Sequence, residues 1–155
     1  MPILNYTTTI AVEKTMGEIN TALARRGVTR IATMYDDQGV ASGLAFTMKT
    51  DYGVRDFELP VRTEGVLAAM KADPAVKPAQ KNPAQAARVA WRIAKDWLEA
   101  QSALIDAQLA TLDEVMMPYM VASFDGERTV TMYGAFRDSQ LAITAGTNHT
   151  NGSEK

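Results

Sequence analysis

The chain has 155 residues, a formal net charge of −2 and 46% hydrophobic residues, enough apolar material for the core of one domain. It contains no cysteine and a single histidine, His149, so the composition excludes disulfides and thiolate chemistry and disfavours histidine-based catalysis. The small negative charge argues against indiscriminate binding to nucleic acid or anionic membranes. We therefore expect no enzyme, no bound metal and no cofactor.

The first sixty residues predict a helix and an antiparallel sheet. Threonine and tyrosine favour a first strand at 4–9, and apolar spacing favours a helix at 13–26, closed by Gly27. Three further strand candidates lie at 28–35, 43–50 and 54–60. Short turn sequences separate these three, and their residues alternate between apolar and polar. Such strands form an antiparallel meander with one buried face.

A long helix is predicted at 84–112, after a short helix at 64–72 and an irregular loop at 73–83. With residues 100° apart, its apolar side chains fall on two adjoining stripes. The stripes are Val89, Ile93, Trp97, Ala100 and Leu104, and Trp91, Ala94, Leu98, Ile105 and Leu109. Because the apolar arc exceeds half the circumference, the helix must be covered from two sides, with both tryptophans in the core. The polar face carries Arg88, Arg92, Lys95, Asp96, Glu99, Ser102 and Asp106.

The carboxyl part of the chain is less regular. The sequence at 111–114 predicts a helix restart, and residues 119–124 and 128–133 fit either a hairpin or helical turns. From about Ser139 the residues are small and polar, which favours a disordered tail at 139–155. We therefore expect a single α+β domain at 1–138: an antiparallel meander of three or four strands packed on a long central helix, with shorter helices.

Positive charge is concentrated between residues 71 and 95. This segment contains six basic residues and one acidic residue, Asp73. We call the six the basic block: Lys71, Lys77, Lys81, Arg88, Arg92 and Lys95. The three helical members share about one quarter of the circumference, and the three lysines precede them. This pattern is typical of a strip that contacts phosphates. The alternative is a solvated helix face, partly neutralised by the i,i+4 pairs Arg92–Asp96 and Lys95–Glu99.

Two other kinds of site receive weaker support from the residues. Aromatic side chains on the predicted sheet could form a platform for stacking bases: Tyr6, Tyr35, Tyr52 and Phe57. Acidic residues in and near the turns could hold a divalent cation, although aspartate is also common in turns for local hydrogen bonding: Asp36, Asp37, Asp51, Asp56 and Glu58. Core packing and turn formation are the favoured interpretations of these two groups.

Several blocks of the chain resemble a known family. They are LNYTTTI at 4–10, EKTMGEI at 13–19, FELPVRTEGVLAAMK at 57–71, RVAWRIAKDWLEAQ at 88–101 and LDEVMMPYM at 112–120. Together they resemble a family of small proteins from bacteriophages and integrated mobile elements, over residues 3–137. The block at 88–101 is the most specific. The resemblance implies a phage or mobile-element setting, but it implies no activity and no catalytic residues.

The sequence thus favours a non-catalytic binding or regulatory protein that contacts nucleic acid through the basic block. The alternative is an inhibitor of a host defence system that acts by binding a host protein or by sequestering a nucleotide signal. No stretch of about 20 apolar residues occurs, and the first residues lack a basic, signal-like start, so we expect a cytoplasmic protein without a membrane partner. Homo-oligomer formation is left open.

Overall fold

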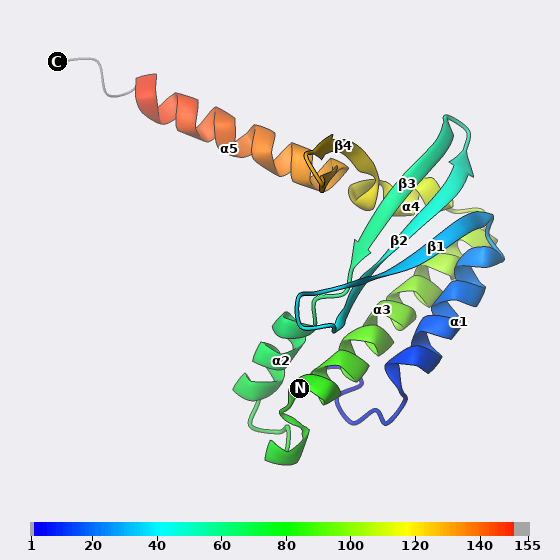
Figure 1. The fold of residues 1–155 in the computed structure, drawn as a ribbon, viewed down its shortest axis with the longest axis vertical. Helices are drawn as coiled ribbons and strands as arrows, with labels where there is room; N and C mark the ends of the chain where they lie inside the picture. The colour runs from blue at the N-terminus through cyan, green and yellow to red at the C-terminus, as the bar shows by residue number, and fades with distance from the viewer. Residues whose placement is uncertain (1, 151–155) are drawn as a thin grey trace.

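A computed structural model describes residues 2–150 and shows an α+β fold (Figure 1). In chain order its elements are α1 (Val12–Ala24), β1 (Val28–Tyr35), β2 (Ala41–Thr50), β3 (Gly53–Pro60), α2 (Thr63–Ala72), η1 (Pro78–Gln80), α3 (Pro83–Asp106), α4 (Leu112–Met116), η2 (Met117–Tyr119), β4 (Val121–Asp125), β5 (Arg128–Thr131) and α5 (Met132–Thr150). The predicted fold class is confirmed. A three-stranded antiparallel meander packs against the long helix α3, with shorter helices around it.

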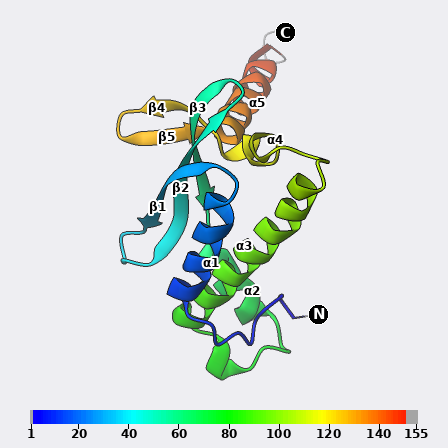
Figure 2. The ribbon, with the colours of Figure 1, turned by 90° about the vertical axis from the view of Figure 1, so that its right-hand side faces the viewer.

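The meander buries one face against helices. Its strands follow the order β1-β2-β3, and Phe46 of β2 pairs with Ile31 on one side and Phe57 on the other. The rings of Phe46 and Phe57 stack with their centroids 5.1 Å apart, and both are buried. Helices α1 and α3 lie side by side against this face (Figure 1 and Figure 2). The alternating pattern of the strands therefore specifies which face meets the helices.

Helix α3 begins at a well-defined cap and carries the centre of the core. The Asn82 side chain accepts a hydrogen bond from the Gln85 backbone N–H, and Pro83 occupies the first helical position. Trp91 is fully buried, and its indole Nε1 donates to the Ala41 carbonyl at 3.2 Å. Leu98 is buried in the same cluster. The prediction of a central helix with Trp91 in the core is confirmed.

The amino-terminal segment is not a strand, so that expectation is wrong. Residues 4–7 form a turn in which Asn5 adopts a left-handed φ of 63°. The side chain of Gln85 donates to the carbonyls of Tyr6 and Thr8, both at 2.9 Å. These carbonyls are thus bonded to a glutamine on α3, and the segment follows the helix.

Helix α3 ends six residues before the predicted boundary at 112. It stops at Asp106, and Gln108 adopts a left-handed φ of 59°, which breaks the helical path. The apolar arc is consequently covered in its first half and open in its second, where Leu104 is exposed. Trp97 is half-buried and contacts Tyr119 edge-on, with centroids 6.1 Å apart. Its expected place in the core is only partly achieved.

The segment after α3 attaches a second, two-stranded sheet to the edge of β3. Thr111 and Glu114 form a reciprocal capping box at the start of α4, as the helix restart predicted. The open question at 119–133 is answered by a hairpin, β4 paired with β5. An isolated bridge joins Met120 to Phe57, and Thr129 hydrogen-bonds Glu58. The hairpin is therefore held against β3.

The predicted disordered tail is wrong for residues 139–150, which continue helix α5; residues 151–155 lie outside the described part. Four residues of this segment are strong helix formers, and they continue the helix that begins at Met132: Gln140, Leu141, Ala142 and Ala145. α5 projects away from the rest of the molecule (Figure 1). At its start, the Met132 N–H donates to the Met120 carbonyl at 2.8 Å. Within residues 2–150, no helix has the length and apolar content needed to cross a membrane.

We predict that the two tryptophans differ in their contribution to stability. Trp91→Ala should lower the free energy of unfolding by about 3–5 kcal/mol, because it leaves a large cavity and an unpaired carbonyl. Trp97→Ala should lower it by less, roughly 1–2 kcal/mol, because part of that side chain already contacts solvent. Urea unfolding of both variants checks the difference. Equal losses would contradict the position of Trp91 at the centre of the core.

We also predict that the outer part of α5 is dispensable for folding. Residues 139–146 are exposed, so truncation after Asp138 should change the free energy of unfolding of the remaining chain by less than about 0.5 kcal/mol. A thermal melt monitored by tryptophan fluorescence reports on the core alone. A large decrease in the midpoint would show that α5 stabilises the core after all.

Candidate functional site

Two of the three helical residues of the basic block are engaged in ion pairs. Arg92 places Nη1 2.6 Å from Oε2 of Glu18 and 3.5 Å from Oγ1 of Thr15, both on α1. Only 14% of the Arg92 side chain is exposed. Lys95 pairs with Glu99 at 2.5 Å, which confirms one of the two predicted i,i+4 pairs. These two cations therefore help to join and neutralise the helices, and the continuous strip is not formed.

The other predicted intrahelical pair, Arg92–Asp96, is wrong. Asp96 instead accepts a hydrogen bond from Nδ2 of Asn5 at 2.7 Å, so the amino-terminal segment occupies its carboxylate. Arg92 donates instead to Glu18 on α1. Sequence spacing along one helix could not identify these partners, because Glu18 lies 74 residues from Arg92 and Asn5 lies 91 residues from Asp96.

Arg88 keeps its charge available. Its Nε and Nη2 donate to Oε1 of Gln85, at 2.9 and 2.7 Å, which fixes the guanidinium beside the start of α3. In the described chain no carboxylate forms an ion pair with Arg88. The neutral amide of Gln85 orients the group without cancelling its charge, and three of the five N–H donors of the guanidinium remain.

Gln85 is the residue of this region that sequence analysis missed. It is buried, and its side chain contacts the amino-terminal segment and Arg88 at once. The signal was present: Asn82 and Gln85 have the spacing of an N-cap residue and its N3 partner. That pattern would have marked Gln85 as a hydrogen-bonding position, although its side chain here reaches beyond the cap.

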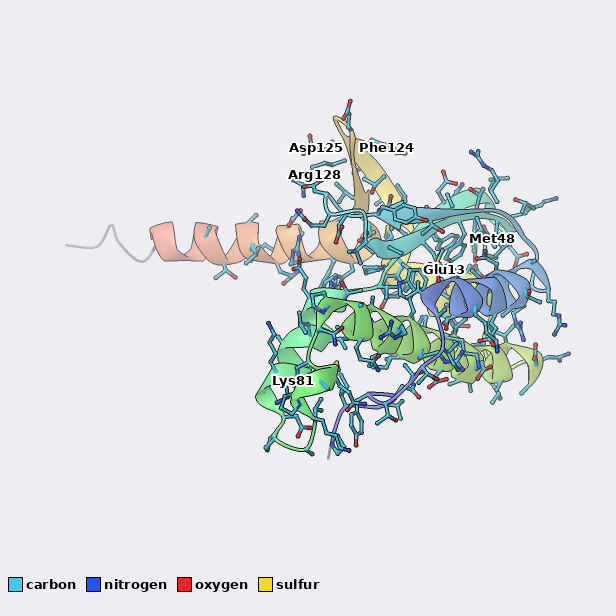
Figure 3. All side chains as sticks on the ribbon, turned by 60° about the horizontal axis from the view of Figure 1, so that its bottom comes forward. Glu13, Met48, Lys81, Phe124, Asp125 and Arg128 are labelled. Atoms are coloured by element: carbon cyan, nitrogen blue, oxygen red, sulfur yellow. The ribbon has the colours of Figure 1, made fainter. Side chains whose placement is uncertain are left out.

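The three lysines of the basic block lie at the end of α2 and on either side of η1, and we call them the lysine cluster: Lys71, Lys77 and Lys81. Nζ of Lys81 donates to the Lys71 carbonyl at 3.2 Å, so the loop folds back on the end of α2. Figure 3 shows Lys81 far from Phe124, Asp125 and Arg128 of the hairpin. Among residues 2–150, no carboxylate pairs with any of the three ammonium groups.

The one acidic residue within the basic block does not neutralise it. Oδ1 of Asp73 accepts a hydrogen bond from the Ala75 N–H at 2.8 Å, which closes a local turn. Lys71 and Lys77 are exposed, and Lys81 is half-buried. The cluster therefore presents unneutralised positive charge at one end of the fold, with Arg88 roughly 8 Å further along α3 from Pro83.

The weaker sequence hypotheses are not supported by the geometry. Phe57 faces the helices and is fully buried, Tyr6 lies outside the sheet, and Tyr52 occupies a turn, so the stacking platform is wrong. In the part of the chain that the structure describes, no three histidine or carboxylate side chains gather into a group able to hold a metal ion.

No protein-family model, no curated protein and no solved structure matches the chain. The candidate site is therefore interpreted from its own geometry.

Arg92 should behave as a structural residue. We predict that Arg92→Gln lowers the free energy of unfolding by about 1–2 kcal/mol, because it leaves Glu18 and the buried Thr15 hydroxyl without their cation. Lys77→Gln is the matched control and should stay within about 0.5 kcal/mol of the parent. Urea unfolding, with Glu18→Gln added to complete a double-mutant cycle, isolates the coupling. A cycle without coupling would show that the pair is not formed.

Proposed function

We propose that the protein is a non-catalytic binding protein of a phage or mobile element that contacts the nucleic-acid backbone through the lysine cluster and Arg88. Two observations carry the proposal. The three lysines have no ion-pair partner in the described chain, and a neutral glutamine holds the Arg88 guanidinium in the second turn of α3. The resemblance of residues 88–101 to the mobile-element family supports the setting.

The chemistry of the cluster favours phosphate as its target. Lysine ammonium groups on flexible stems act as point charges that follow a phosphate backbone, whereas the Arg88 guanidinium can donate two parallel hydrogen bonds to one phosphate. Binding of this kind releases counterions and depends steeply on salt. Because phosphate contacts carry no base information, the lysine cluster and Arg88 supply affinity and no sequence preference. Arg92 and Lys95 no longer belong to the proposed contact set.

Helix α5 favours a second candidate function, inhibition of a host defence system by protein binding. Four large apolar side chains of α5 are more than half exposed: Tyr133, Phe136, Leu141 and Ile143. Exposed apolar helix surfaces commonly contact another protein. This candidate uses the opposite part of the molecule, so the two functions can be tested separately.

For the nucleic-acid proposal, we predict that replacing Lys71, Lys77 and Lys81 together by Gln weakens binding to all oligonucleotides about equally. Fluorescence anisotropy with labelled single- and double-stranded DNA, over a salt series, measures the affinity. The slope of log K against log salt should become shallower by about 2–3, since each phosphate contact contributes about 0.7–0.9. Thermal melts establish that the variant folds.

The control removes the same charge elsewhere. Lys14, Lys49 and Arg137 are exposed on α1, β2 and α5, and their joint replacement by Gln should leave the slope unchanged. If both triple variants lose the same affinity, the effect comes from net charge alone, and the lysine cluster is not the contact surface. Absence of binding at low salt would remove the nucleic-acid proposal and leave protein binding through α5.

A further inference from the structure

Helix α5 carries an exposed apolar stripe. Its members lie within about 100° of the helix circumference and are 36% to 61% exposed, and we call them the α5 stripe: Met132, Tyr133, Phe136 and Ile143. Arg137 and Asp138, the charged residues of the described part of α5, fall outside this arc. Helices of this length gain most of their stability by packing an apolar face. The surface that covers the stripe should therefore be apolar and uncharged.

A groove of about 330 Å³ between α2, α3 and η2 has this character, and we call it the apolar groove. Ile93, Ala94 and Trp97 of α3 form one wall, and each of them is only half-buried. Val66 of α2 lines the opposite wall. Among the lining residues that the structure describes, Arg62 alone is charged. Helices α2 and α5 lie on the same side of the molecule, away from α1 (Figure 1).

The α5 of one chain does not cover the apolar groove of that chain. The helix starts against η2, whose Tyr119 lines the groove, and then runs away from the body (Figure 1 and Figure 3). It is continuous over Met132–Thr150, so it does not fold back. A second copy, related by a two-fold axis near η2, can exchange helices with the first. Each α5 then lies across the groove of the other copy.

The buried area favours this exchange over simple pairing of two α5 helices. The exposed surface of the four stripe side chains amounts to about 400 Å² per chain. Two stripes packed on each other would bury about 800 Å² in total, less than the roughly 1,200 Å² of small specific interfaces. Two stripes packed on two grooves would bury about 1,600 Å², which is the standard size of a stable interface.

We propose that the protein forms a two-fold symmetric dimer in which each α5 stripe packs into the apolar groove of the second copy. Phe136 and Ile143 enter the groove, and the exposed part of Trp97 becomes covered. The dimer carries two lysine clusters, so one nucleic-acid strand can contact both, with a gain in avidity. Self-association does not depend on nucleic-acid binding, and it assigns α5 to a second copy and not to a host protein.

Sedimentation velocity of the intact chain over a concentration series tests the dimer. We expect a shift from monomer to dimer in the micromolar range. Phe136→Gln should weaken dimerisation at least about 10-fold, because each dimer contains the residue twice. Leu141→Gln is the matched control: Leu141 is as exposed as Phe136, at 62% against 61%, but lies about 140° away on the same helix. It should leave the dimerisation constant unchanged.

A second measurement tests where the stripe binds. Trp91 is fully buried, so a change in acrylamide quenching of tryptophan fluorescence reports on Trp97. Quenching should decrease as the parent dimerises, whereas pairing of two α5 helices alone would leave it unchanged. Ala94→Gln places a larger side chain in the apolar groove and should weaken dimerisation. Ala100→Gln, at an exposed position of α3, is its control and should not.

Thermal melts separate dimerisation from folding. The midpoint of the parent should rise with protein concentration, and that of Phe136→Gln should not. In dilute solution the two should coincide, because a single copy folds without the second; a lower dilute midpoint of Phe136→Gln would make Ala94→Gln the deciding variant.

Three results would overturn the proposal. The first is a chain that stays monomeric at several hundred micromolar, which would leave an unrelated protein as the partner of α5. The second is an equal effect of Phe136→Gln and Leu141→Gln, and the third is a dimer with unchanged quenching of Trp97. The triple lysine variant should dimerise normally, so failure here is separable from failure of the nucleic-acid proposal.

Discussion

Trp91 connects the long helix to the sheet, and the positions of the other helices depend on this contact. A buried indole needs an acceptor for its N–H, and the Ala41 carbonyl at the start of β2 provides it. The hydrogen bond and the surrounding core fix both the distance of α3 from the sheet and its rotation about its own axis. Because Arg92 follows by 100°, this rotation directs it toward α1, where Glu18 meets it.

The same rotation divides the basic block between structure and surface. On the side of α3 that α1 covers, a cation contributes most by pairing, as Arg92 does. The lysine cluster precedes α3 in the chain, and no carboxylate among residues 2–150 forms an ion pair with it, so it keeps its charge. Arg88 shares a feature with each group: its side chain is oriented by a contact within the fold, with Gln85, yet that partner is neutral and leaves its charge uncompensated. Charge that looks continuous in the sequence is therefore used in two different ways, and only one of them leaves cations available to a ligand.

The sequence predicted what short-range patterns determine. The three strands, their single buried face and the central place of α3 followed from periodicity, and the helix restart from the Thr111–Glu114 spacing. The failures concern long-range partners. Residues 4–9 have strand-forming composition, yet the carbonyls of Tyr6 and Thr8 accept hydrogen bonds from the Gln85 side chain and not from a neighbouring strand. The end of α5 was missed because residues 139–150 are mostly small and polar and show little apolar periodicity. The three lysines of the site could be named from the sequence because of their charge. The partner of Arg92 could not, because it depends on how α1 packs against α3.

The attachment of the amino-terminal segment to α3 imposes an order on assembly. Gln85 bonds to residues 77 and 79 positions earlier, and Asn5 bonds to Asp96 across 91 positions. The turns of the meander, by contrast, join neighbouring strands and can close as soon as β3 has left the ribosome. Residues 5–8 are synthesised before α3 and can form these hydrogen bonds only after Gln85 and Asp96 have been added to the chain. The segment before α1 can therefore reach its native position only after α3 has been synthesised.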